Sequence, residues 1–161
     1  MADILEVTSM LGNTAEPKRQ FRWILALKGI DAYTCRSFGR PSGGFSEVPI
    51  DYINIRRFIS GKWQPSDLEL TLWDPIAPSA AQKVNEWVRL NYEISTGRAG
   101  YFAFYSTDFD LKLLDPPGGV AETWKIVGAW PKAIDFGTLN YASDELVECR
   151  LTLRFNQAFL Q

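Results

Sequence analysis

Histidine is absent from the 161-residue chain, and cysteine occurs only at Cys35 and Cys149. Without histidine the chain lacks the most common general base of enzymes and a frequent zinc ligand. No serine lies in a GxSxG pattern, and a serine or cysteine nucleophile would lack its usual activating base. The two cysteines are far apart and form no CxxC pair, which predicts buried free thiols rather than a redox or zinc site. We therefore expect a protein that is not an enzyme.

The chain also has no excess of positively charged residues. The chain has 17 Lys and Arg against 19 Asp and Glu, which gives a formal net charge of -2 at pH 7. Affinity for nucleic acid phosphates comes mostly from Lys and Arg, so this balance disfavours a nucleic-acid-binding β module. Four arginines make the middle of the chain locally basic, but acidic residues are interspersed with them, which favours a subunit contact.

Long apolar runs do not occur either. No segment reaches the roughly 18 apolar residues that a membrane span needs, and the first residues lack the basic and apolar regions of a signal peptide. We therefore expect a protein without a membrane segment that is made and kept in the cytoplasm.

Two short patterns resemble ligand motifs without completing them. Gly61-Lys62 is followed by Trp63, where a P-loop needs Ser or Thr to bind magnesium. Asp108, Asp110 and Asp115 lack the glycine and the final glutamate of an EF-hand calcium loop. We expect a turn in the first case and a solvated turn and strand in the second, with no metal and no cofactor.

Aromatic residues, by contrast, are abundant, with 6 Trp, 6 Tyr and 10 Phe. Such side chains concentrate in cores and in protein interfaces. Residues 51–58 mix apolar side chains with Asp51, Arg56 and Arg57 and offer no single apolar face. A strand pair of this kind usually has its second face covered by another chain. The sequence therefore favours a protein that assembles.

Alternation of apolar and polar residues predicts several antiparallel strands, at 21–27, 33–35, 45–73, 101–105, 111–114, 122–129 and 147–156. Ser79 is a predicted N-cap, and apolar residues at helical spacing after it predict about three turns of helix. We expect a mainly β fold: a β-sandwich or β-barrel of two packed antiparallel sheets with one flanking α-helix and a long extended hairpin. Residues 1–20 are predicted to be an N-terminal arm, and residues 21–161 a single β domain.

Two groups of residues follow from these patterns. The predicted structural core includes Trp87, Cys149, Leu151 and Leu153. The predicted contacts between subunits lie in the hairpin: Pro49, Ile50, Tyr52, Asn54, Arg56, Arg57, Phe58, Gly61 and Trp63.

Three segments, in order, resemble the tail tube proteins of contractile-tailed bacteriophages. Residues 48–74 have that family's Pro-containing strand, an Asn with basic neighbours, a Gly turn, and an alternating strand that closes in Asp. Residues 81–87 are similar to its helix with Gln-Lys and Trp, and Gly128-Ala129-Trp130-Pro131 is similar to its Gly-x-Trp-Pro step. The resemblance therefore adds Gly128, Trp130 and Pro131 to the predicted structural core, and it implies that the hairpin contacts join subunits or rings. The resemblance departs at the N-terminal arm and at residues 108–119.

The resemblance implies a structural virion protein: a tail tube subunit that forms stacked hexameric rings, a hollow conduit for DNA ejection. Its implied partners are further copies of itself, the tail sheath protein, and the baseplate and tail terminator proteins. DNA would pass through the lumen without specific binding, and assembly would take place in the cytoplasm of the host bacterium. The polar face of the last strand supplies candidates for the lumen wall: Glu148, Arg150, Thr152 and Arg154.

Two alternatives share this fold. One is a baseplate protein that initiates the tube, and the other is the tube protein of a type VI secretion or contractile injection system.

Overall fold

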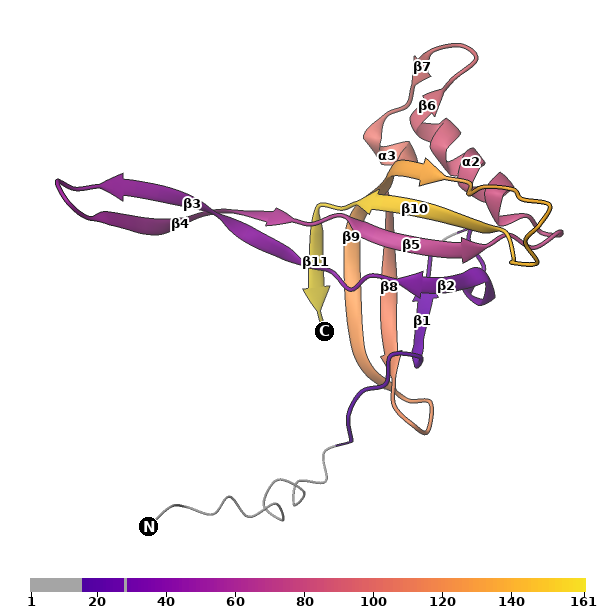
Figure 1. Ribbon diagram of the computed structural model, residues 1–161, viewed down its shortest axis with the longest axis horizontal. Helices are drawn as coiled ribbons and strands as arrows, with labels where there is room; N and C mark the ends of the chain where they lie inside the picture. The colour runs from indigo at the N-terminus through magenta and orange to yellow at the C-terminus, as the bar shows by residue number, and fades with distance from the viewer. Residues whose placement is uncertain (1–15, 28) are drawn as a thin grey trace.

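The computed structural model describes residues 16–27 and 29–161, and it is mainly β with antiparallel strand pairs and one long helix (Figure 1). This confirms the predicted fold class. Predicted arm residues 1–15 lie outside the described residues, and residues 16–20 form neither helix nor strand. No helix within the two described ranges is both long and apolar enough to cross a membrane.

Seven strands form one folded sheet with the order β1-β8-β9-β10-β5-β2, and β11 also pairs with β9. The strands are β1 (Trp23–Ala26), β2 (Cys35–Phe38), β5 (Leu68–Trp73), β8 (Thr107–Leu114), β9 (Val120–Asp135), β10 (Glu148–Arg154) and β11 (Gln157–Leu160). The first part of β9 pairs with β8 and β11, and its last part pairs with β10. β1, β8 and β11 run across the direction of β2, β5 and β10 (Figure 1), so β9 connects two layers.

The change of layer occurs around Gly128, whose φ is +67. Along β9, the pairing with β11 ends at Val127, and the pairing with β10 begins at Trp130. A Cβ at residue 128 would lie 2.5 Å from Nδ2 of the Asn156 side chain. Glycine therefore suits the bend both by its backbone conformation and by the space available.

Apolar side chains of both layers meet in one core. The alternation predicted for the last strand is present, since Cys149, Leu151 and Leu153 are at most 1% exposed. β5 adds Leu68, Leu70 and Leu72 to the same core. Pro131 and Gly128 are also buried, whereas Trp87 and Trp130 are only partly buried. Val147 and Phe21, predicted to lie on apolar strand faces, are exposed because they lie beyond the paired part of their strands.

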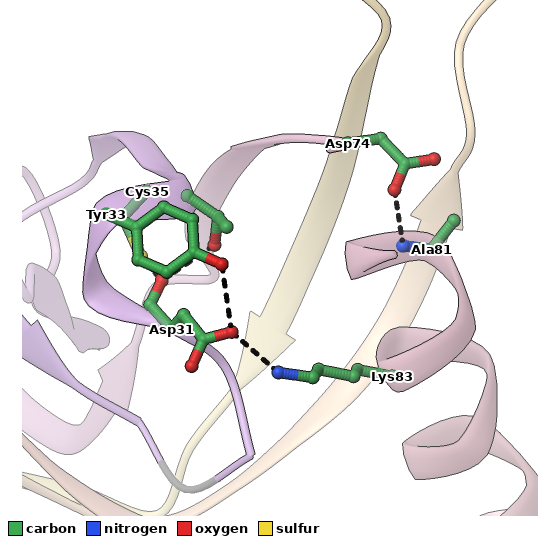
Figure 2. Close-up of polar contacts among 7 residues, drawn as sticks. Asp31, Tyr33, Cys35, Asp74, Ala81 and Lys83 are labelled. Carbon is green, nitrogen blue, oxygen red and sulfur yellow. Dashed lines mark hydrogen bonds and ion pairs between the residues drawn. The ribbon is translucent and has the colours of Figure 1, made fainter. Parts of the chain in front are cut away.

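Helix α2 (Ala80–Asn91) begins directly after Ser79, as predicted. Ser79 Oγ accepts a hydrogen bond from the Gln82 amide (3.3 Å) and donates one to Asp74 Oδ1 (3.0 Å). The same Asp74 oxygen accepts from the Ala81 amide at 3.1 Å, and Lys83 contacts Asp31 at 2.7 Å (Figure 2). The first turn is thus tied to the end of β5 and to the turn before β2.

Replacing Ser79 with alanine should lower the free energy of unfolding by about 1 kcal/mol, because the Gln82 amide loses its cap. Urea titration followed by circular dichroism measures this change. Ser79→Thr keeps a hydroxyl and should lose clearly less. Equal losses for both variants would show that the hydroxyl does not cap the helix.

Two predicted strand segments are helical instead. Residues 33–35 fall largely in the short helix η1 (Ala32–Thr34), where the Asp31 carbonyl accepts from the Thr34 amide (3.0 Å) and hydroxyl (2.7 Å). Residues 101–105 form α3 (Phe102–Tyr105), which packs against α2. The strand prediction was wrong there because packing against α2 outweighs the strand preference of aromatic residues.

Other differences concern lengths and short strands. β8 begins before the predicted segment 111–114 and ends with it. β9 begins before and ends after the predicted segment 122–129, and β11 was not predicted at all. The two-residue strands β6 (Tyr92–Glu93) and β7 (Arg98–Ala99) form a small hairpin beyond α2. Both cysteines are free thiols, as predicted, although Cys35 is only partly buried. Burial raises the pKa of each thiol to about 11, so both stay protonated at neutral pH.

Candidate assembly surfaces

The most prominent surface is the hairpin of β3 (Gly43–Asp51) and β4 (Arg56–Pro65). Among the described residues these strands pair only with each other, and they extend far from the seven-stranded sheet (Figure 1). In the register, Pro49 lies opposite Phe58, Ile50 opposite Arg57, and Asp51 opposite Arg56. A two-stranded hairpin is marginally stable alone in water, so this long arm is a candidate for contact with another chain.

The structure brings the predicted contact residues together on this hairpin and leaves most of them exposed. Ile50 and Gly61 are partly buried, whereas these residues are exposed: Pro49, Tyr52, Asn54, Arg56, Arg57, Phe58 and Trp63. Two further apolar residues of segment 51–58 were not among the predicted contacts, Ile53 at 99% exposure and Ile55 at 72%. The sequence held a signal for both residues, because turns favour Gly, Pro, Asn, Asp and Ser over isoleucine. Large apolar residues that lie exposed in a turn indicate a contact with another chain.

The base of the hairpin is braced by its own side chains. The rings of Phe45 and Trp63 make an edge-to-face contact with centroids 5.0 Å apart. Ser46 Oγ accepts from the Lys62 amide at 2.9 Å, and a Cβ at Gly61 would lie 2.3 Å from that oxygen. Trp63 and Gly61 therefore support the hairpin itself, and the tip is the part with the most unpaired apolar surface.

The polar face of the layer formed by β10, β5 and β2 carries the four predicted lumen residues. Glu148 pairs with Arg36 and lies 3.9 Å from Arg150. Asp67 accepts from Lys132 at 2.5 Å and from Arg154 at 2.9 Å. Among the four residues, Arg150 is exposed, whereas Glu148, Thr152 and Arg154 are partly buried. Most charges on this face are thus paired with a partner of opposite sign.

Hydrogen bonds from Lys132 and then Arg154 lower the pKa of Asp67, against a smaller opposing effect of burial. The carboxylate therefore stays charged at neutral pH and holds both cations on the face.

A buried carboxylate on the layer that contains β1, β8 and β11 contacts both the predicted N-terminal arm and the segment before the β3–β4 hairpin. Glu122 in β9 is 6% exposed and pairs with Lys18, which belongs to the predicted arm. It also accepts from Arg40 at 2.6 Å and from the Trp124 indole. Arg40 lies between β2 and the hairpin, and its guanidinium carbon is 5.8 Å from the centre of the Trp124 ring. Glu122 therefore connects the arm, the hairpin base and the sheet.

The sequence analysis missed this cluster. Its signal was an acidic residue at position 122, in step with Trp124 and Ile126 along the inward side of a predicted strand. A carboxylate at an inward position needs charged or hydrogen-bonding partners, but the sequence does not name them, because Lys18 and Arg40 are remote in the chain.

The pKa of Glu122 lies below its ordinary value, mainly because Lys18 donates a hydrogen bond to it. A lowered pKa in the folded state adds stability above the unfolded pKa, and this stability disappears as the pH falls through the folded value. Glu122→Gln should therefore lower the free energy of unfolding by about 1 to 3 kcal/mol at pH 7. The difference from the unmodified chain should shrink on acidification.

Urea titrations at a series of pH values from 7 to about 3 test this expectation, since ordinary glutamates titrate near 4.3. Glu86→Gln, at an exposed position of α2, is the matched control and should change little. A Glu122→Gln difference that is independent of pH would contradict the charged network.

Solved structures of known proteins share this architecture, whereas comparisons of the sequence find no match. No protein-family model matches the sequence. No curated protein matches it at a significant level either.

Solved structures do match. A chain of the anti-feeding prophage cap, the tube-terminating cap, has 18% sequence identity and a TM-score of 0.72, over 92% of this chain and 93% of that one. A chain of the sheath/tube terminator of an extracellular contractile injection system, PVC, has 14% identity and a TM-score of 0.73, over 92% and 99%. A chain of the PVC sheath-tube complex has 17% identity and a TM-score of 0.64, over 96% and 97%. The resemblance inferred from the sequence is thus confirmed at the level of the fold: this chain has the fold of the tube-type proteins of contractile tails and injection systems.

Proposed function

We propose that this chain is a structural subunit of the tube of a contractile tail or injection particle, without enzymatic activity. The observation that carries the proposal is the combination of a tube-type fold with a long hairpin whose apolar tip is bare in the single chain. Exposed apolar surface of this kind marks an interaction site. The residues 21–161 would act as one β domain, with residues 1–20 as an arm that contacts neighbours.

Ring formation is supported by the edges of the second layer. In the order β9-β10-β5-β2, β2 pairs only with β5, and residues 130–135 of β9 pair only with β10 among the described residues. This layer thus ends in two edges that no described strand of the chain pairs with, and such edges need cover. Joining β2 of one subunit to β9 of the next would continue the sheet around a hexameric ring.

In such a ring the apolar face of the layer stays on the subunit core, and the polar face turns to the lumen. The wall would then contain Glu148, Arg150, Thr152 and Arg154. Most of these charges are paired with opposite charges, so DNA phosphates would find few free cations there. A wall of this kind suits the passage of DNA during ejection without specific binding.

The outer surface would contact the tail sheath protein, and the ends of the tube would contact baseplate and terminator proteins. The chain would then be a component of the virion tail, assembled in the cytoplasm of the host bacterium. The subunits are proposed to stack ring on ring, with hairpins covering the neighbouring copies.

A second candidate is a subunit of a ring at one end of the tube, such as a terminator. The TM-scores of the chains from the cap, terminator and baseplate structures, 0.72, 0.73 and 0.71, exceed that of the chain from the sheath-tube complex, 0.64. A terminator would form one ring and stop, whereas a tube-body subunit would stack rings without limit. The two candidates therefore differ in the length of the particles they form.

Negative-stain electron microscopy of the purified chain at high concentration, with sedimentation velocity beside it, tests both candidates. Hollow tubes with six-fold end views would support a tube-body subunit, and single rings would support a terminator. If the chain stays monomeric both alone and with purified baseplate components, the proposed function is wrong.

A further inference from the structure

We propose that the hairpin tip, residues 51–58, docks on the loop between β9 and β10, residues 136–147, of a second copy of this chain. We call the second segment the acidic loop. This inference rests on the proposed function and names the surface that receives the hairpin.

The two segments lie at opposite ends of the long axis of the molecule (Figure 1). The hairpin tip therefore cannot serve its own acidic loop, and the contact joins one end of a subunit to the other end of the next. A head-to-tail contact of this kind is heterologous, and it generates closed rings or open stacks. Both kinds of assembly are what a tube requires.

The acidic loop offers a surface that needs cover. It borders a cavity of about 1050 Å³ with side chains of β2, β5 and β10, among them Arg36, Trp73 and Arg150. Leu139, Tyr141 and Leu146 of the loop are 84%, 112% and 68% exposed. The hairpin tip presents apolar side chains of similar size, including Ile53 and Ile55. Burial of these two apolar sets against each other would remove both from water.

The charges of the two segments determine which surface the hairpin tip fits. Residues 136–147 contain Asp144 and Glu145 and no Lys or Arg, whereas residues 51–58 contain Arg56 and Arg57 against Asp51. Arg56 pairs with Asp51 at 2.5 Å. Within the described part of the chain, Arg57, Asp144 and Glu145 form no ion pair. The free cation of the tip and the free anions of the loop are therefore complementary.

A rival surface is less suited to the tip. The small hairpin beyond α2 also exposes apolar residues, such as Ile94 at 79% and Tyr92 at 49%. Residues 89–98, however, contain two arginines and one glutamate, and that glutamate already pairs with Arg89. The remaining charge has the same sign as the tip, so this surface would repel it.

A charge-reversal pair tests the contact. Arg57→Glu and Glu145→Arg are made singly and together, and the association of each chain is measured by sedimentation velocity and electron microscopy. Each single change should weaken association by at least about tenfold, and the double change should restore it to within about threefold of the unmodified chain. Lys125→Glu, which reverses an exposed cation of β9, is the matched control and should assemble normally.

The outcomes separate the inference from the proposed function. Rings or tubes whose formation is blocked by both single changes and restored by the double change support the inference. Rings that form in the unmodified chain, with a double variant as defective as the two losses combined, overturn the inference and leave the proposed function intact. No association in any variant, including the unmodified chain with baseplate components, overturns both.

Discussion

Replacing Ile53 with aspartate should leave the subunit folded and prevent its assembly. Ile53 is 99% exposed, so the substitution removes no contact of the single chain, and surface changes of this kind usually alter stability by at most about 0.5 kcal/mol. In the assembly, the same position is proposed to lie against apolar side chains of a neighbour. An unpaired carboxylate buried there would cost several kcal/mol, so association should weaken by about 100-fold or more.

The control is another isoleucine of equal exposure. Ile76, between β5 and α2, is 102% exposed, and Ile76→Asp makes the same chemical change outside the hairpin. Circular dichroism should show both variants folded, and electron microscopy should show rings or tubes for Ile76→Asp only. Normal assembly of Ile53→Asp would place the hairpin tip outside the interface.

Removing the side chain of Trp87 should have the largest effect on folding. Trp87 lies on α2 and packs against the core while remaining partly buried. Its indole nitrogen donates to the Tyr105 carbonyl at 2.7 Å, and the Tyr105 ring packs on Trp130 with centroids 6.2 Å apart. Trp87 therefore holds α2, α3 and β9 together. Trp87→Ala should lower the free energy of unfolding by about 3 kcal/mol, at the lower end of such substitutions because the side chain is not fully buried.

Trp87→Phe separates the two contributions of this residue. The phenyl ring keeps most of the packing but cannot donate to the Tyr105 carbonyl, so its loss should be about 1 kcal/mol. Urea titrations of both variants give the two values. A loss below about 1 kcal/mol for Trp87→Ala would show that α2 is not held to the sheet through this side chain.

These predictions address different levels of the molecule. Ile53 tests the surface that needs a partner, and Trp87 tests the body that positions it. The Glu122 cluster lies between the two, since it ties Lys18 of the arm and Arg40 before the hairpin to β9. We therefore expect damage to the body to reduce assembly indirectly, and damage to the tip to reduce it without a loss of stability.

Local patterns in the sequence were sufficient for several elements. The alternation that ends in Cys149, Leu151 and Leu153 predicted a strand with one buried face, because side chains of a strand point to opposite sides. Ser79 predicted the start of α2, because a cap depends on residues within one turn.

Alternation within residues 45–73 predicted antiparallel strands, and the lack of a single apolar face at residues 51–58 indicated cover by another chain. The turn expected at Gly61-Lys62 was wrong, because both residues lie within β4. The chain turns between Asp51 and Arg56 instead.

Contacts between remote segments were beyond the reach of these patterns. The segment at 101–105 reads as a strand, yet it is helical because α2 packs on it and Trp87 binds the Tyr105 carbonyl. The length of β9 and its change of layer at Gly128 depend on pairing with three other strands. The partners of Glu122 come from positions 18 and 40, which no spacing rule relates to position 122.

The sequence by itself thus determined the class of fold, the helix start, the strand character of the hairpin and the absence of histidine. These features are local, since they depend on periodicity, capping and composition. Only the tertiary structure decided which charges pair on the polar face, which carboxylate is buried, and that the basic hairpin tip and the acidic loop lie at opposite ends of the molecule. Those facts depend on how the chain folds back on itself, because burial and the distance between remote side chains exist only in the folded state.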